Sequence, residues 1–173
     1  STKQGAASNI LRDLLRRIAL NLGKSEEEYL AMVAQSFMVS ADNAHAQHPN
    51  HPEYSDSDNC PYMNKGIVIK FNANQKYTTT GLTAALFRAV CEDAGVPVHT
   101  YYNRPDMPGG STLGNLLGHT VSLPMADVGA PQWAMHSCVE TAHTGDALAL
   151  YQGLEAFYAS EFLLEGDGSY QLK

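Results

Sequence analysis

The spacing of apolar positions changes along the chain between the period of a helix and that of a strand. Apolar residues recur every three to four positions over 6–22 and 79–95, as in amphipathic helices. Short continuous apolar runs lie between such stretches. GIVIKFN (66–72) is the clearest, and such runs are typical of strands buried on both faces. The alternation predicts an α/β fold, with helices on both faces of a mixed, largely parallel central sheet.

Start and stop signals set the bounds of the expected elements. The first helix ends at Gly23, and a capping box of Ser25 and Glu28 opens a second helix that runs to about Gln35. The later expected elements are a strand (36–42), a proline-broken loop (43–64), strands at 66–72 and 96–103 around the helix 79–95, a glycine- and proline-rich loop (104–115), a strand (120–129), a short apolar segment (133–140) and a helix (144–163). We find no internal repeat and no linker, so residues 1–173 are expected to belong to one domain.

Composition narrows the classes of function. The formal net charge of -7 argues against nucleic acid or an anionic membrane surface as partner. No apolar run reaches the roughly 18–20 residues that span a bilayer. Cys60, Cys91 and Cys138 form no CxxC pair, which favours a reducing, cytoplasmic setting.

Candidate chemistry is concentrated in SADNAHAQHPNHPEYSD (40–56), where Asp42, His45, His48 and His51 recur at every third position. On a helix, these side chains would share a face and could bind zinc, because carboxylates and imidazoles are zinc ligands. Two prolines within the row would break such a helix, so the spacing loses that meaning. Taken singly, most of these histidines are more simply explained as side chains that hold a loop together by hydrogen bonds.

Further candidates lie later in the chain. His136 lies in an apolar segment, where a buried imidazole needs either a hydrogen bond or a metal ion, and spacing alone does not decide between them. A metal-bound thiolate at Cys138 is conceivable, but an inert buried thiol is the simpler interpretation. Asp42 and Lys70 each fall at the carboxyl end of an expected strand, and the loop 103–115 follows another. Because α/β sheets bind ligands beyond these ends, we expect the three to gather at one edge.

Five motifs, in order along the chain, resemble the aspartyl aminopeptidase family of zinc metallo-exopeptidases. They are TKQGA, SADNAHAQHPN, GIVIKFNANQKYTTT, RPDMPGGSTLG and DVGAPQWAMHS, and the resemblance runs from residue 2 to about residue 160. It implies a zinc-exopeptidase-like fold and an enzyme that uses two zinc ions to release the first residue, Asp or Glu, from peptide substrates. It also implies a homo-oligomer, a dodecamer in this family.

The resemblance further implies roles for individual residues. Asp42 and His136 match ligands of different zinc ions, and His45 matches a histidine that contacts the substrate. Lys70 and Tyr77 match residues that line the substrate pocket. Two zinc ions about 3.5–4 Å apart can together activate a water molecule and polarise the scissile carbonyl.

The same resemblance implies ligands that these 173 residues do not contain. In the family a Glu-Glu pair, which supplies the general base and a metal ligand, lies just upstream of the position of Ser1. A histidine ligand and a bridging aspartate lie earlier. We therefore interpret residues 1–173 as the C-terminal part of a catalytic domain that has no catalytic base of its own. Its partner would be the upstream part of the same polypeptide, with any inserted assembly domain. His48 and His51 are then expected to be scaffold.

Two alternatives remain open at this point. One is a non-catalytic fragment or subunit of a metallopeptidase assembly, which would bind metal weakly or only pack against its neighbours. The other is a di-zinc aminopeptidase with a non-acidic specificity. A buried cation at Lys70 argues against the second, because a pocket for apolar residues has little use for one.

Overall fold

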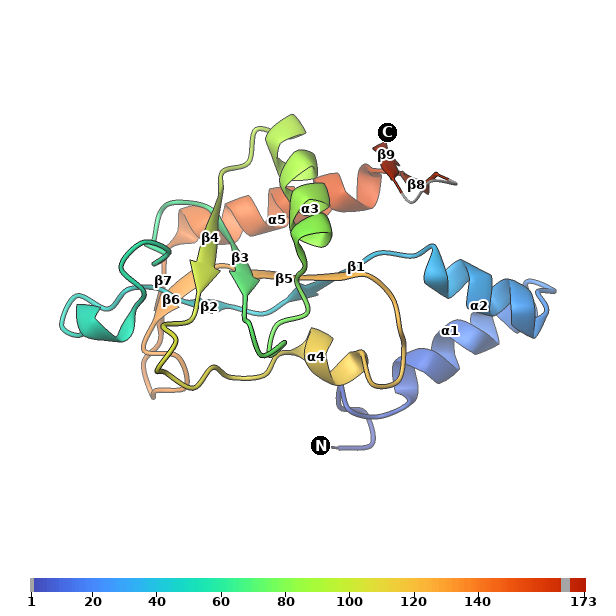
Figure 1. Cartoon of the computed structure of the whole chain (residues 1–173), viewed down its shortest axis with the longest axis horizontal. Coiled ribbons are helices and arrows are strands. Elements are labelled where there is room, and N and C mark those ends of the chain that lie inside the picture. The colour runs from blue at the N-terminus through green and yellow to red at the C-terminus, as the bar shows by residue number, and fades with distance from the viewer. Residues whose placement is uncertain (1, 166–168) are drawn as a thin grey trace.

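Four strands form the central sheet, in the order β1-β5-β3-β4 (Figure 1). Its strands are β1 (Met38–Ala41), β5 (Met125–Gly129), β3 (Ile67–Phe71) and β4 (Val98–Tyr102). The β1–β5 and β3–β4 pairs are parallel, and the central β3–β5 pair is antiparallel. This computed structural model describes residues 2–165 and 169–173. Within them, the expectation of a mixed and largely parallel sheet is confirmed.

Two smaller sheets and five α-helices complete the described structure. The helices are α1 (Ile10–Asn21), α2 (Glu26–Ala34), α3 (Gly81–Asp93), α4 (Leu113–Leu117) and α5 (Thr144–Ala159), with a 3-10 turn at Pro52–Tyr54. The smaller sheets are β2 (Ala44–His45), β6 (Pro131–Trp133) and β7 (Thr141–Ala142), and the hairpin of β8 (Phe162–Leu164) and β9 (Tyr170–Leu172). The parallel β1–β5 pair therefore continues, after a short break, as the parallel β2–β6 pair.

The two faces of the central sheet have different surroundings. On β3, Ile67 and Ile69 point into the main core, where they pack with Phe87 of α3. Helix α5 lies against the same face, and Gly153 allows this, since a Cβ there would be 2.5 Å from the Cδ1 atom of Ile67. Burying these apolar side chains supplies the main stabilising contribution of this layer.

The opposite face of the sheet is polar at its centre. Period-2 alternation places Val68 and Lys70 of β3 there, and Val68 packs with Tyr77 and Tyr101. The short helix α4 covers the β1 side, where the amide N–H of Gly114 donates to Ser40 Oγ at 2.9 Å. Helices therefore lie on both faces, as expected, with α3 and α5 on one side and the short α4 on the other (Figure 1).

A buried carboxylate fixes the start of β3. Asp146, in the first turn of α5, is 1% exposed and accepts the main-chain N–H groups of Asn64 (2.6 Å) and Gly66 (2.8 Å). A carboxylate in the first turn of a helix is also favoured by the helix dipole. The contact couples α5 to the strand that carries Lys70.

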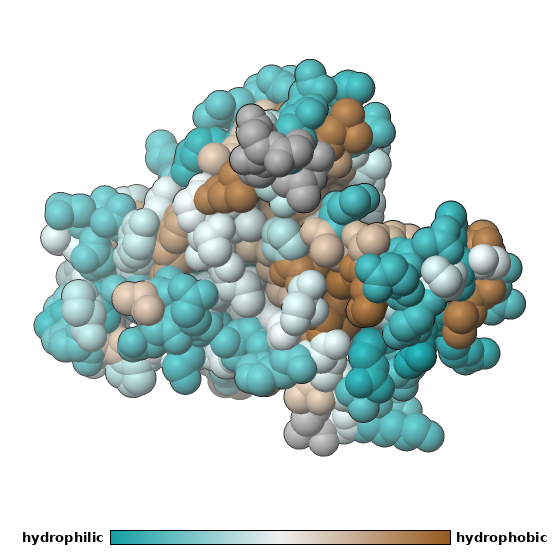
Figure 2. Space-filling view, turned by 45° about the vertical axis from the view of Figure 1, so that its right-hand side comes forward, coloured by the Kyte–Doolittle hydropathy of each residue, from teal (hydrophilic) through white to brown (hydrophobic). Residues whose placement is uncertain are grey.

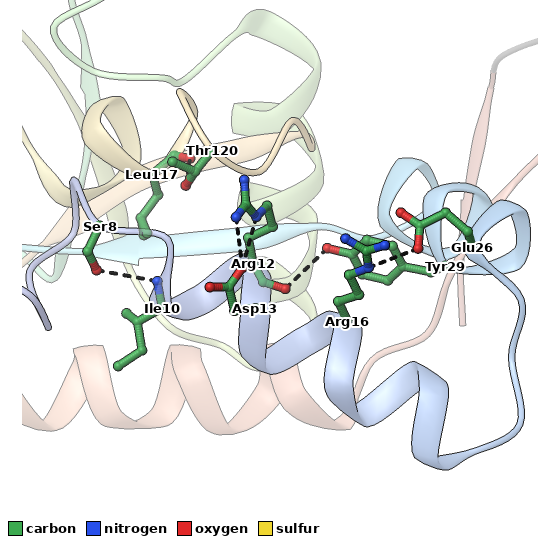
Figure 3. A network of polar contacts seen from close by, with 9 residues as sticks. All are labelled: Ser8, Ile10, Arg12, Asp13, Arg16, Glu26, Tyr29, Leu117 and Thr120. Carbon is green, nitrogen blue, oxygen red and sulfur yellow. Dashed lines mark hydrogen bonds and ion pairs between the residues drawn. The ribbon is translucent and has the colours of Figure 1, made fainter.

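Helices α1 and α2 form a hairpin that extends away from the sheet (Figure 1). Figure 3 shows the polar contacts within it: Arg16 Nε lies 2.9 Å from Glu26 Oε2, and the Tyr29 hydroxyl donates to the carbonyl of Arg12 at 3.4 Å. The expected capping box at Ser25 is present. Figure 2 shows brown, apolar areas among the hydrophilic surface on its right-hand side. Several large apolar side chains of the hairpin are exposed: Ile10, Leu14, Ile18, Leu20, Leu22, Leu30 and Met32.

Four expected elements differ from the structure, and one of them is the loop expected over 104–115, in which helix α4 begins at Leu113. The helix expected over 144–163 ends at Ala159, and Phe162 already belongs to a strand that pairs with β9. The expected strand 120–129 is a strand only from Met125, and the expected loop 43–64 contains β2. In the part of the chain that the structure describes, no helix is both long and apolar enough to cross a bilayer.

Candidate metal and substrate site

The turn between β1 and β2 carries Asp42 and leads into His45. The Asp42 amide donates to the carbonyl of Val128, and that of Ala44 to the carbonyl of Ala130, both at 2.9 Å. Gly129 packs so closely that a Cβ there would be 1.9 Å from the carbonyl oxygen of Asp42. The Asp42 main chain is therefore held tightly, while its side chain is exposed.

Lys70 approaches this turn from β3. Its ammonium donates to the carbonyl oxygens of Asp42 (2.7 Å) and Asn43 (3.5 Å), and lies 5.2 Å from the ring centroid of Tyr77. The expected proximity of Asp42 and Lys70 is confirmed, but the expected reason is wrong. The strands that carry them run in opposite directions, so their carboxyl ends lie at opposite edges of the sheet. The long lysine side chain reaches back to the turn.

Within the described residues, the charge of Lys70 has no direct counter-ion. The side chain is 1% exposed, and among residues 2–165 and 169–173 no carboxylate lies within ion-pair distance of its ammonium. Burial lowers the pKa of Lys70, while the negative charges of Asp127 and Asp42 act in the other direction. A buried ammonium without an ion-pair partner is costly, so an anion would be stabilised beside it.

Asp127 was not identified as a candidate from the sequence. It is completely buried on β5, on the same face as Lys70, and its Oδ2 accepts the N–H (2.5 Å) and hydroxyl (2.8 Å) of Thr78. Its Oδ1 has no hydrogen-bond partner in the described structure. These bonds anchor the segment that contains Tyr77. A charged residue inside the expected apolar strand was the signal that sequence analysis could have used.

Tyr77 completes the surroundings of the ammonium. Its side chain is buried, with its ring centroid 6.2 Å from that of Tyr101. Burial is the main reason why the pKa of Tyr77 is raised far above its usual value, and the neighbours Tyr101 and Asp127 add to it. Tyr77 therefore keeps its proton at physiological pH and can act as a neutral hydrogen-bond donor.

His136 lies in the loop between β6 and β7. It is exposed, so the expectation of a buried imidazole is wrong, because the apolar run leaves the sheet after Trp133. The residue has φ of 68°, and its amide donates to Glu140 Oε1 at 2.5 Å. A positive φ is unfavourable for a non-glycine residue, and such strain is concentrated at functional sites. Cys138 is exposed in the same loop, as a free thiol.

His45 connects these groups. The pKa of His45 is lowered, first because surrounding atoms exclude part of its water and then because His136 and Lys70 add positive charge nearby. The Asp42 carboxylate opposes this shift. The charges of Asp42, Lys70 and His136 thus all act on His45, and the Lys70 ammonium also lies over the ring of Tyr77.

The donor atoms suit zinc but do not complete a site. No hydrogen bond or ion pair within the described residues occupies the Asp42 carboxylate or the imidazole nitrogens of His45 and His136. Oxygen and imidazole nitrogen are suitable zinc donors. Within the described chain, however, no three His, Cys, Asp or Glu side chains are grouped so that they could hold a metal ion. Asp42, His45 and His136 are therefore suited to form part of a zinc ligand set, but not all of it.

His48 and His51 line the same cavity as His45. Their ring centroids are 5.8 Å apart, and His51 stacks on Tyr54 at 5.2 Å. His48 Nδ1 accepts the amide N–H of Asn50 at 3.2 Å, and His51 Nδ1 lies 3.1 Å from a carboxylate oxygen of Glu53. These local contacts agree with the scaffold role expected for both histidines.

Replacing Gly129 by alanine tests how tightly the Asp42 turn is packed. The new methyl group would overlap the Asp42 carbonyl, so we expect a loss of roughly 1–3 kcal/mol of unfolding free energy, and more if the turn cannot shift. Chemical denaturation measures this loss. Gly110→Ala is the matched control, because a Cβ there meets no atom within 4 Å. Equal stability of the two variants would contradict the tight packing.

The sequence is similar to those of known proteins from one family. A sequence model described as "Aminopeptidase I zinc metalloprotease (M18)" matches residues 1–158. A "Probable M18 family aminopeptidase 2" of Clostridium acetobutylicum is 41% identical over 158 residues, which cover 91% of this chain and 36% of that protein. The protein of the same name from Mycobacterium leprae is 40% identical over 161 residues, covering 93% and 38%.

Solved structures show the same fold. A chain in the "Cryo-EM structure of the Ape4 and Nbr1 complex" superimposes with a TM-score of 0.85 at 39% identity, over 91% of this chain and 30% of that one. The M18 aminopeptidase of Thermotoga maritima gives 0.80 at 22% identity, over 90% and 36%. The chain thus spans about a third of the length of the relatives that it matches. The sequence match and the shared fold together show that the chain belongs to the M18 family of aminopeptidase I zinc metalloproteases.

Proposed function

We propose that the full-length protein is a zinc-dependent aminopeptidase that releases N-terminal residues, preferably Asp or Glu, from peptides. The observation that carries the proposal is the hydrogen bond of the buried Lys70 ammonium to the main-chain carbonyl of Asp42. The pKa of His45 responds to the charges of Lys70, His136 and Asp42, which supports one shared site. Membership of the M18 family supports metal-dependent peptide hydrolysis as the chemistry of such a site.

In this proposal, the chain supplies part of a two-metal site. Asp42 and His136 would each hold a different zinc ion, together with ligands from the upstream part of the polypeptide. When bound, the metal pair polarises the scissile carbonyl and lowers the pKa of a water molecule. His45 has its pKa lowered, so it is mainly neutral at pH 7 and can hold the reacting end of the peptide by hydrogen bonding. The general base is expected among the upstream glutamates.

The acidic preference rests on Lys70. Its ammonium is buried and bonded only to main-chain carbonyls, so a substrate carboxylate would supply the ion-pair partner that the described residues do not. Tyr77 adds a protonated hydroxyl to the same surroundings. An aminopeptidase for apolar residues would gain nothing from a desolvated cation at this position.

The family resemblance also implies assembly of the full-length protein into a homo-oligomer, with a dodecamer as the expected size. The exposed apolar side chains of the α1–α2 hairpin offer surface that other parts of the polypeptide or further copies could cover. The three free cysteines suit a reducing compartment such as the cytoplasm.

Activity of the full-length protein tests the proposal directly. We expect release of the first residue from peptides that begin with Asp or Glu, loss of that activity after chelation, and recovery with zinc. No aminopeptidase activity in a zinc-loaded, correctly folded full-length protein would contradict the proposal and favour a non-catalytic role.

The 173-residue chain alone is expected to be inactive on the same peptides. It contributes fewer than three grouped metal donors among the described residues, and no general base is expected within it. Mass spectrometry of peptide products is the measurement, with intact-mass analysis to exclude a co-purifying upstream chain. Turnover by the pure chain would show that its own residues complete the site.

A further inference from the structure

A cavity of about 290 Å³ adjoins the candidate site at His45. His45 forms part of its wall, and Met135, directly before the candidate ligand His136, forms another part. The row His45, His48 and His51 lines this one cavity, so the structure does bring the three histidines together, though not around a metal ion. Its volume lies at the lower end of the range of ligand sites, which is about 300–1,000 Å³.

The wall on the histidine side is held in place by main-chain contacts. Trp133 Nε1 donates to the carbonyl of Gln47 at 2.9 Å, and the amide of Gln47 donates to the carbonyl of Pro61 at 2.8 Å. The ring centroids of His48 and Trp133 are 5.9 Å apart. Because His48 Nδ1 accepts a main-chain N–H, a neutral ring carries its proton on Nε2, where it can donate to a peptide carbonyl.

The lining selects for uncharged groups. Met107, Pro108, Tyr54 and Met135 provide apolar surface, and methionine side chains adapt to ligands of different shape. None of the described residues that line the cavity is Asp, Glu, Lys or Arg. A charged side chain placed here would lose water without gaining an ion-pair partner.

The cavity borders a second, larger cavity. Asn103, Met107 and Pro108 separate it from a larger cavity of about 740 Å³, which they line as well. No chain precedes the first residue of an aminopeptidase substrate, so the pocket for that residue can be closed. The leaving side must be open, because the rest of the peptide continues there. Lys70, the candidate partner of the first side chain, does not line the cavity.

We propose that this cavity binds the second residue of the substrate, directly after the scissile bond, and that it prefers a neutral, apolar side chain. The inference rests on the proposed aminopeptidase function and adds a specificity at the second position. Met107 would contact the side chain, and His48 would hold a carbonyl of the leaving peptide.

The test compares Asp-Leu-Ala, Asp-Phe-Ala and Asp-Glu-Ala as substrates of the full-length zinc protein. We expect kcat/KM to be about tenfold higher for Leu or Phe than for Glu at the second position. In Met107→Ala the values for Leu and Phe should fall about fivefold to tenfold, while the value for Glu changes little. Zinc content and the preference for Asp over Leu at the first position should stay as in the wild type.

Met32→Ala is the matched control, because Met32 is exposed to a similar extent (39%, against 36% for Met107) but lies on α2. His48→Ala should slow all three peptides together, mainly by raising KM. Equal wild-type rates on the three peptides would overturn the inference. So would a Met107→Ala variant that changes the preference at the first position instead. A zinc-loaded wild type without any activity would instead refute the proposed function, and this inference with it.

Discussion

Asp42→Asn and His136→Ala, each made in the full-length protein, are expected to lower zinc content and to remove most of the aminopeptidase activity. Both side chains are exposed, both influence the pKa of His45, and no hydrogen bond in the described structure occupies their donor atoms. Asparagine keeps the shape of the aspartate but removes the charge that balances a zinc ion. Loss of one ligand leaves that ion under-coordinated, so both its affinity and its catalytic contribution should fall.

Zinc analysis after dialysis and kcat/KM on an Asp-initiated peptide are the two measurements. Asp58→Asn and His119→Ala are suitable controls, because both residues are exposed and lie outside the cluster. Since Asp42 and His136 are assigned to different ions, each variant should lose part of the zinc rather than all of it. Near-normal zinc content and turnover in either variant would refute the role of that residue.

Lys70→Met is expected to abolish the preference for acidic first residues while slow cleavage of neutral peptides survives. A charge-assisted hydrogen bond to a carboxylate is worth roughly 1.5–3 kcal/mol, which corresponds to about tenfold to a hundredfold in selectivity. Methionine has a similar length and keeps the burial but cannot pair with an anion. The preference should therefore fall by that factor, mainly through slower cleavage of Asp and Glu peptides.

The comparison uses kcat/KM for peptides that begin with Asp, Glu, Leu and Ala. The rate on neutral peptides also shows whether the variant keeps the structure of the site. Lys70 bonds the main chain of Asp42, so displacement of that turn would slow the cleavage of every substrate. Lys76→Met, at an exposed position close in sequence, is the control. Equal wild-type rates on Asp and Leu would remove the acidic specificity but leave the aminopeptidase function standing.

Local sequence signals placed most of the elements. Apolar periodicity predicted α1 and α3, and the Ser25–Glu28 pair predicted the capping box that opens α2. GIVIKFN correctly predicted a buried strand. These features depend on contacts between residues close in the chain, so a short window of sequence contains the information. The motif resemblance likewise indicated a zinc aminopeptidase, because motifs are strings of neighbouring residues, and the match to the M18 family confirms that coarser assignment.

The resemblance could name Asp42, His45, Lys70 and His136, but it could not say how they meet. A mixed sheet was expected, but not that β3 and β5 are its antiparallel pair, because an apolar run reads the same whichever way its partner runs. The exposure of His136 was missed as well, since burial depends on where the chain leaves the sheet.

The amino-acid sequence by itself determined most of the helices and the buried strand 66–72, and its motifs named the candidate site residues through a family resemblance. Only the tertiary structure showed that Lys70 is bonded to the turn at Asp42, that Asp127 anchors the neighbouring segment, and that three histidines line one cavity. Each of these contacts joins segments brought together by strand pairing and core packing. Spacing along a chain carries no distance between such segments, because that distance is set by how the whole sheet folds.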